Sequence, residues 1–268
     1  MTITPSTRYI YPYAWDLAVI ANQARYPTHP SVPVLLGADI VTDELYLTTE
    51  ELEHTGLSHP SIRPITLQEA ARIQGDFVIP SHVVGLDLIP QIGVRRLIRN
   101  CRIKVDFPAL LKKAVNVNEL IVKHETVIDS RSNTLTVTSS NETLTGLVSL
   151  GDVTVYRTIQ PNEKIEDATL LGVQTSQSGG RCLFEQHAFL DIRVKIPFKT
   201  SIESHILKTY RKTTSEGRTL DLQLMEAIKK EQQQDQRTMV EERVPVVVLG
   251  KEKASQSPHY CGELPTTV

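Results

Sequence analysis

The sequence has few of the features that identify a protein class at once. Cysteine is rare: Cys101, Cys182 and Cys261 are far apart, and none belongs to a Cys-x-x-Cys pair. This spacing argues against a zinc site or a disulfide framework, so no metal site is expected. The longest apolar runs, such as residues 244–249, are far shorter than the roughly 20 residues needed to span a bilayer. We therefore expect a soluble or peripheral protein.

The N-terminal segment and the charge balance exclude further classes. Residues 1–13 contain one cation, Arg8, and no sustained apolar run, so neither a secretory signal nor an Arg-rich transit peptide is visible. Import into an organelle by another route stays open. The 29 Lys and Arg residues nearly balance the 31 Asp and Glu residues, which gives no footprint for nucleic acid. Any anionic ligand must be held by a local site.

Catalytic motifs are also lacking. The histidines are scattered without metal-ligand spacing, and no Ser, His and Asp order can be singled out. Residues 66–75 are similar to a short motif of DNA cytosine methyltransferases, but the Pro-Cys nucleophile and Gly-rich cofactor loop of those enzymes are missing. We expect neither an enzyme nor a bound cofactor.

The chain does carry clear signals for secondary structure. Helical spacing of apolar residues predicts a helix over 15–24, which Pro27 ends, and a β-rich run predicts a strand over 32–41. Residues 42–92 differ in texture and are interpreted as an insertion. A single helix is predicted inside it over 66–74, with Thr66 as its N-cap and Glu69 three residues later.

Strands dominate the second half of the chain until one long helix follows. A basic strand is predicted over 94–103 and a short helix over 107–115, opened by a proline. Further strand-like segments cover residues 120–128, 134–144, 147–159, 168–175 and 183–198. Apolar residues then recur every three or four positions over about 200–233, which describes one face of an amphipathic helix. The fold class is therefore α+β, a meander of strands closed by a long helix in a helix-grip arrangement.

Several local strings, in the same order along the chain, resemble the PRELI-like family of START-like lipid carriers. They include Arg25-Tyr26-Pro27, Arg96-Leu97-Ile98, Phe107-Pro108, and Tyr210 with Gly217 and Arg218 in the final helix. The resemblance covers about residues 8–41 and 93–231. It implies a lipid-transfer domain over 1–231 that contains the insertion 42–92. The low-complexity composition that begins at residue 232 predicts a flexible tail over 232–268. Two positions depart from the family pattern: Asn100 replaces a lysine, and Thr213 replaces an asparagine.

The resemblance implies a function as well as a fold. A curved antiparallel sheet and the C-terminal helix would enclose an apolar cavity for one phospholipid, of the phosphatidic acid or phosphatidylserine class, carried between membranes. Burial of acyl chains would contribute about 0.8 kcal/mol per methylene. The implied location is the mitochondrial intermembrane space. The implied partners are an anionic membrane surface, met transiently, and a small helical-hairpin chaperone with twin cysteine motifs.

A phosphate headgroup needs cations and hydrogen-bond donors near the cavity, since an unpaired buried anion is very costly. The resemblance makes Arg25, Arg96, Lys104 and Thr213 the candidates for headgroup binding. Membrane or lid contact is assigned to Phe107, Leu110, Lys208, Arg211, Lys212 and Arg218. Each cation also has a plainer interpretation: Arg25 could complement a helix C-terminus, Lys104 could be an ordinary surface lysine, and the basic helix face could simply be solvated.

Two other functions stay open at this point. A START-like scaffold can host a small-molecule enzyme in its cavity. Alternatively, the chain could be a non-catalytic interaction protein in which the insertion is the active part.

Overall fold

The computed structural model describes residues 2–3, 6–84, 89–104, 117–171, 180–193 and 199–243. The chain divides into two compact units, residues 1–230 and 231–268. Within the described residues of the second unit, the final helix continues to Arg243. Among the described residues, no helix is both long enough and apolar enough to cross a membrane.

The first unit is built on one large sheet. Its strands, in chain order, are β1 (Thr2–Ile3), β2 (Thr7–Tyr11), β3 (Leu35–Leu47), β4 (Arg63–Pro64), β5 (Phe77–Pro80), β6 (Val94–Lys104), β7 (Glu119–Asp129), β8 (Thr134–Asn141), β9 (Val148–Thr158), β10 (Thr169–Leu170) and β11 (Cys182–Ile192). The strand order is β10-β2-β11-β9-β8-β7-β6-β3-β5-β4, with β1 beside β11. All pairs are antiparallel except β10 with β2. This confirms the predicted meander.

Alternation along the strands gives the sheet two distinct faces. Leu135 of β8 is in register with Tyr156 of β9, which is in register with Phe184 of β11, and all three are buried. They belong to the main apolar cluster, together with Trp15 of helix α1 (Trp15–Gln23). Because side chains two residues apart in a strand share a face, every second residue of the long strands faces this core. We call this face the inner face.

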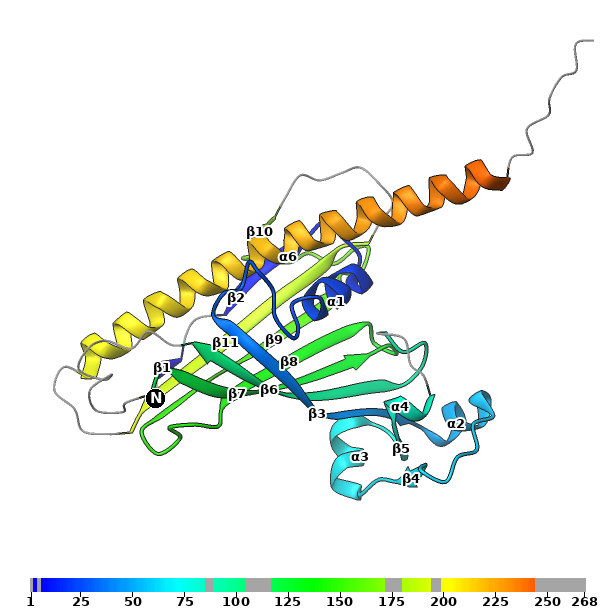
Figure 1. Cartoon of the computed structure of the whole chain (residues 1–268), viewed down its shortest axis with the longest axis horizontal. Coiled ribbons are helices and arrows are strands. Elements are labelled where there is room, and N and C mark those ends of the chain that lie inside the picture. The colour runs from blue at the N-terminus through cyan, green and yellow to red at the C-terminus, as the bar shows by residue number, and fades with distance from the viewer. Residues whose placement is uncertain are drawn as a thin grey trace, which may run out of the picture. The chain divides into compact units, whose positions relative to one another are not determined.

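Two helices cover the inner face. Helix α6 (Lys199–Arg243) lies along the long strands, and α1 also packs over this face (Figure 1). Asn22 of α1 donates a hydrogen bond to the Tyr156 hydroxyl, and Tyr210 of α6 donates one to Asp152 of β9. The α+β helix-grip arrangement predicted from the periodicity is therefore confirmed.

Residues 49–84 form structure of their own beside the β3 edge of the sheet. They comprise α2 (Thr49–Thr55), β4, α3 (Leu67–Ile73), β5 and α4 (Ser81–Val84). Both α2 and α3 begin with a complete capping box, Thr48 with Glu51 and Thr66 with Glu69. Each box pairs backbone amide groups that the N-terminus of a helix otherwise leaves without partners. Helix α3 confirms the helix predicted over 66–74.

The structure changes several predicted boundaries. Strand β3 extends to Leu47 rather than ending near residue 41, because β6 and β5 pair with its second half. Helix α6 continues beyond residue 233 to Arg243, through Gln, Glu and Arg residues that favour helix. Of the strand predicted over 168–175, the described residues contain only the short β10. The strand predicted over 183–198 corresponds to β11, which ends earlier, at Ile192. The predicted helix over 107–115 lies outside the described residues.

Candidate functional site: an apolar groove beneath the long helix

An apolar groove lies between one end of the sheet and the N-terminal half of α6. Its volume is about 480 Å³. The floor is formed by side chains of β6, β7, β9 and β11, namely Ile103, Leu120, Val148, Leu150 and Leu190. Helix α6 contributes Ile206, Thr209, Tyr210 and Thr213, and the rim carries Pro33, Val34, Lys104 and His205. The volume falls within the roughly 300–1,000 Å³ of small-molecule sites.

Strand register explains why this part of the sheet is apolar. Ile103 pairs with Leu120 across β6 and β7, and Leu190 pairs with Leu150 across β11 and β9. Leu190 is fully buried against Leu150 and Ile206. The alternation of each strand therefore places apolar side chains on the same face at the same end of the sheet.

A polar cluster occupies the inner face deeper along the same strands. Arg99 of β6, only 5% exposed, lies over the ring of Tyr26 at 4.5 Å and donates to the Gln23 amide oxygen at 2.7 Å. His124 of β7, in register with Arg99, lies 2.8 Å from the Tyr26 hydroxyl. Burial, reinforced by the positive charges of Arg99 and Arg25, lowers the pKa of His124 to about 4. This histidine is therefore neutral in the folded protein at physiological pH.

Arg25 lies next to this cluster but is engaged by α6. It forms an ion pair with Asp221 and donates a hydrogen bond to the Gly217 carbonyl. Asp221 is 1% exposed and also accepts hydrogen bonds from the hydroxyls of Tyr11 and Tyr156. The guanidinium of Arg25 neutralises this carboxylate and does not line the apolar groove. Its observed role is to join α1 to α6.

Arg96 lies on the opposite face of the sheet from the groove. Its Nε donates to Glu125 at 2.8 Å, and its Nη1 donates to the Tyr46 hydroxyl. Arg72 of α3 contacts the same Glu125 carboxylate. The interpretation of Arg96 as a cavity residue is therefore wrong. The strand alternation gives the reason: Arg99 shares the inner face with Leu97, whereas Arg96 is one residue out of phase.

The structure brings together two of the four headgroup candidates. Lys104 and Thr213 both line the apolar groove, from β6 and α6 respectively. His205 also lies at the rim, and sequence reasoning did not single it out among the scattered histidines. The one sequence feature that could have identified it is its place beside Ile206, an apolar residue on the inward face of the amphipathic helix.

The residues assigned to membrane or lid contact separate into three groups. Lys208, Arg211 and Lys212 are exposed on α6, as a surface role requires. Arg218 is 6% exposed and donates to Gln186 of β11, so it does not share the exposed face of α6 with those three cations. It lies about one turn beyond Thr214, on the side of α6 that faces the sheet. Phe107 and Leu110 lie outside the described residues.

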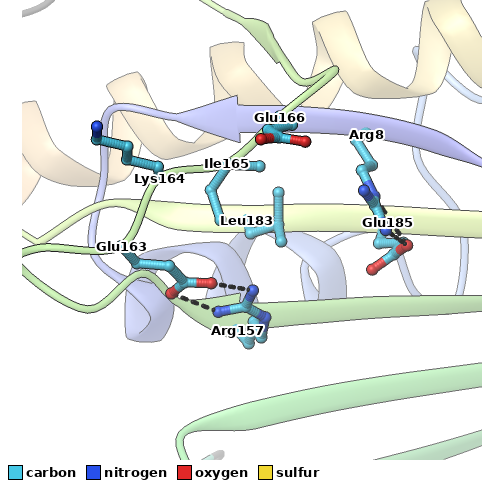
Figure 2. A pocket seen from close by; sticks show the side chains of 8 residues that line it. All are labelled: Arg8, Arg157, Glu163, Lys164, Ile165, Glu166, Leu183 and Glu185. Atoms are coloured by element: carbon cyan, nitrogen blue, oxygen red, sulfur yellow. Dashed lines mark hydrogen bonds and ion pairs between the residues drawn. The ribbon is translucent and has the colours of Figure 1, made fainter.

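A second hollow, of about 280 Å³, lies between β2, β9, β11 and the segment that follows β9 (Figure 2). Its charged side chains are largely paired with one another. Arg157 donates to both carboxylate oxygens of Glu163, and Arg8 contacts Glu185 at 2.8 Å. Leu183, an odd-numbered residue of β11, lines this hollow, which places it on the face opposite the groove. Such mutual neutralisation makes it a weaker candidate for a ligand site.

Metal and thiol chemistry receive no support from the part of the chain that the structure describes. It contains no group of three His, Cys, Asp or Glu side chains that could hold a metal ion. Burial raises the pKa of the Cys101 thiol to about 11 and that of Cys182 to about 12. Both thiols are therefore protonated and poorly reactive at neutral pH.

Comparisons with known proteins identify distant relatives of this chain in sequence. The chain is 22% identical over 211 residues to the protein named Protein real-time of Drosophila melanogaster. The matched region covers 79% of this chain and 23% of that relative. The Aedes aegypti protein of the same name is 23% identical over 222 residues, covering 83% of this chain and 25% of the relative. This chain thus spans about a quarter of the length of these relatives.

A solved structure and a family model also match. The crystal structure of Ara h 8.0201 matches with a TM-score of 0.38 and 9% identity, covering 84% of this chain and 99% of that one. The model of the PRELI-like family matches residues 76–235, from β5 into α6, which is more than half of the chain. The chain therefore belongs to the PRELI-like family, and this membership supports a function in lipid binding or lipid transfer.

Proposed function

We propose that this chain is a carrier, not an enzyme, that holds one anionic phospholipid in the apolar groove and moves it between membranes. The observation that carries the proposal is the groove itself, an apolar hollow of about 480 Å³ with Lys104 and His205 at its rim. Phosphatidic acid and phosphatidylserine are the proposed cargo, since each combines apolar chains with a negatively charged headgroup.

The groove suits acyl chains because its floor offers them little besides apolar carbon. Leu120, Leu150 and Leu190 line it from three different strands, and Ile206 closes it from α6. Each methylene transferred from water to such a surface contributes about 0.8 kcal/mol. A chain with many methylenes would therefore be retained strongly, whereas a small polar substrate would gain little from these walls.

The rim suits an anionic headgroup. Lys104 is exposed at the end of β6, and His205 is exposed on α6, and both border the groove. A Lys ammonium attracts a phosphate as a point charge, and the Thr213 hydroxyl can donate a hydrogen bond beside it. Lys208, Arg211 and Lys212 then lie on the exposed side of the same helix, where they would attract an anionic membrane surface by about 1 kcal/mol per cation.

The proposal includes a location and a protein partner. By the resemblance of its motifs, the chain would act in the mitochondrial intermembrane space with a small helical-hairpin chaperone that has twin cysteine motifs. Cell fractionation with protease protection tests the location. Purification of the tagged chain from that fraction tests the partner. Recovery of the chain in the cytosol alone would contradict the location, and recovery without any small cysteine-paired protein would contradict the partner.

Lipid transfer between vesicles tests the central claim. Donor vesicles carry fluorescent phosphatidic acid or phosphatidylserine, and the rate of transfer to acceptor vesicles is measured for the wild type and for Ile206→Gln. The glutamine places a polar amide inside the groove and should slow transfer. Ile121→Gln is the matched control, because Ile121 is 39% exposed and does not line the groove.

Mass spectrometry of lipids that co-purify with the wild-type protein identifies the cargo directly. We expect glycerophospholipid in stoichiometric amount, and less of it with Ile206→Gln at unchanged thermal stability. Absence of transfer for both lipids with the wild type, with the chaperone present, would contradict the carrier proposal. Equal transfer by the Ile206→Gln and Ile121→Gln variants would exclude this groove as the site.

A further inference from the structure

A third hollow lies on the other side of α6 from the apolar groove, between that helix and the β2 edge of the inner face. Its volume is about 410 Å³. Tyr9 of β2 and Gln186 of β11 form one wall, and Arg211, Ser215 and Arg218 of α6 form the other. The groove and this hollow share a single lining residue, Tyr210. We call this second site the arginine pocket.

Arg218 is held in place without a carboxylate partner among the described residues. It is 6% exposed, and its Nη1 donates to the neutral amide oxygen of Gln186 at 3.1 Å. Its guanidinium lies over the rings of Tyr9 and Phe184, at 4.4 and 5.3 Å from their centroids. The buried Nε has no hydrogen-bond partner in the described part of the chain. A buried charged group with an unused donor is costly unless an anion completes it.

Gln186 is itself held by a carboxylate, that of Asp152. Asp152 of β9 accepts hydrogen bonds from the Tyr210 hydroxyl at 2.9 Å and from the Gln186 amide nitrogen. These bonds fix the amide of Gln186 so that its oxygen faces Arg218. Asp152 therefore fixes the orientation of the Gln186 side chain but does not itself line the pocket.

The mouth of the pocket adds positive charge and a hydroxyl donor. Arg211 is exposed, and the described residues provide no ion pair for it. Ser215 is exposed one turn along the same helix and can donate through its hydroxyl. None of the nine residues around the pocket is acidic. Two guanidinium groups, each with several N–H donors in one plane, and a nearby hydroxyl can donate hydrogen bonds to the oxygens of a phosphate group.

We propose that the arginine pocket binds a phosphate group, with Arg218 at its base and Arg211 at its mouth. This site is separate from the lipid groove, and the inference does not rest on the proposed carrier function. The phosphate could belong to the headgroup of a lipid in a membrane surface or to a free phosphate or phosphomonoester. Tyr210, tied to Asp152, forms the partition between the pocket and the groove.

Binding of inorganic phosphate to the full chain, measured by isothermal titration calorimetry at constant ionic strength, provides the first test. Arg211→Gln should weaken binding about tenfold, which corresponds to one charge-assisted hydrogen bond. Arg218→Lys should also weaken it, because an ammonium keeps the charge but lacks the fork of donors. Lys230→Gln is the charge-matched control, since Lys230 is exposed on α6 and does not line the pocket, and it should leave phosphate affinity unchanged.

Vesicles of phosphatidylcholine, with and without a minor fraction of phosphatidic acid, identify the source of the phosphate. If the pocket takes a lipid headgroup, Arg211→Gln weakens binding to the phosphatidic acid vesicles more than Lys230→Gln does, and inorganic phosphate competes with the vesicles. If it takes free phosphate, calorimetric binding depends on Arg211 while vesicle binding is equal in the two variants. Both results support the site.

The proposal is overturned if neither phosphate nor vesicle affinity distinguishes Arg211→Gln from Lys230→Gln. Arg211 is exposed, so its substitution leaves the fold intact and keeps the test valid even if Arg218→Lys is unstable. Failure of this test would also remove Arg211 from the proposed membrane contact, but it leaves the apolar groove as the carrier site untouched, because lipid transfer and the Ile206→Gln variant are measured independently.

Discussion

Arg25, two residues after the end of α1, and Asp221 of α6 form an ion pair in the interior of the protein, and two tyrosine hydroxyls donate hydrogen bonds to the carboxylate. Asp221 is almost completely buried, whereas the Arg25 side chain keeps 22% of its surface exposed. The pair thus joins the end of the first helix to the last one over the inner face of the sheet. It also explains why a cation at position 25 is needed irrespective of any ligand.

Removing Arg25 should therefore affect stability before it affects binding. Arg25→Gln leaves the Asp221 carboxylate buried without its counterion, and we expect the free energy of unfolding to fall by about 3 kcal/mol. Arg25→Glu, which brings a second carboxylate to the same place, should be more damaging. Urea denaturation measures both. Arg8→Gln is the control, because the exposed pair of Arg8 with Glu185 is worth less than about 1 kcal/mol; an equally small loss at Arg25 would contradict the assigned role.

Lys104 should set the preference of the groove for anionic lipids. Lys104→Glu reverses a charge at the groove rim, and we expect transfer of phosphatidic acid to fall several-fold while transfer of phosphatidylcholine changes little, since each cation is worth about 1 kcal/mol near such headgroups. Lys123→Glu is the matched control, because it makes the same charge change on a neighbouring strand away from the groove. Equal effects of the two substitutions on vesicle transfer would remove Lys104 from the site.

His124 should make the folded protein sensitive to mild acid. Its pKa is about 4 in the folded state, below the ordinary value of 6.5, so the unfolded chain binds the proton first as the pH falls. The stability contributed by the neutral imidazole is complete above pH 6.5 and is lost progressively as the pH falls towards 4. His124→Gln removes this titration. Unfolding free energies measured at neutral pH and near pH 5 should therefore differ less in the variant than in the wild type, by about 1 to 2 kcal/mol.

Gly217 offers a stabilising substitution. It lies inside α6, its conformation is ordinary for a helix, and a Cβ added there would meet no atom within 4 Å. Gly217→Ala should raise the free energy of unfolding by about 0.5–1 kcal/mol, since alanine loses less backbone entropy in a helix. The Arg25 bond to the backbone carbonyl of residue 217 is unaffected by the change. Thermal denaturation measures the gain, and an unchanged or lower midpoint would show that the glycine has a packing role.

Much of the fold was predictable because its signals are local. The periodicities of two and of three to four residues identified the long strands and α6, and the Thr66 and Glu69 pair identified the start of α3. The second half of β3 was missed because its strand state depends on pairing with β5 and β6, which lie further along the chain. Of the predicted headgroup residues, Lys104 and Thr213 line the groove, whereas Arg96 lies on the opposite face, because the phase of a strand depends on its partners.

By itself the sequence determined the element types, the amphipathic closing helix and the family to which the chain belongs, because residue order and side-chain polarity carry these properties directly. Only the tertiary structure decided which cations lie beside the apolar groove. Arg25 is neutralised by Asp221, 196 positions later in the chain, Arg96 is directed to the far face by strand phase, and Arg218 of α6 is buried against Gln186 in the arginine pocket. A charge becomes a binding group only when its own protein does not already satisfy it, and that depends on which side chains folding places beside it.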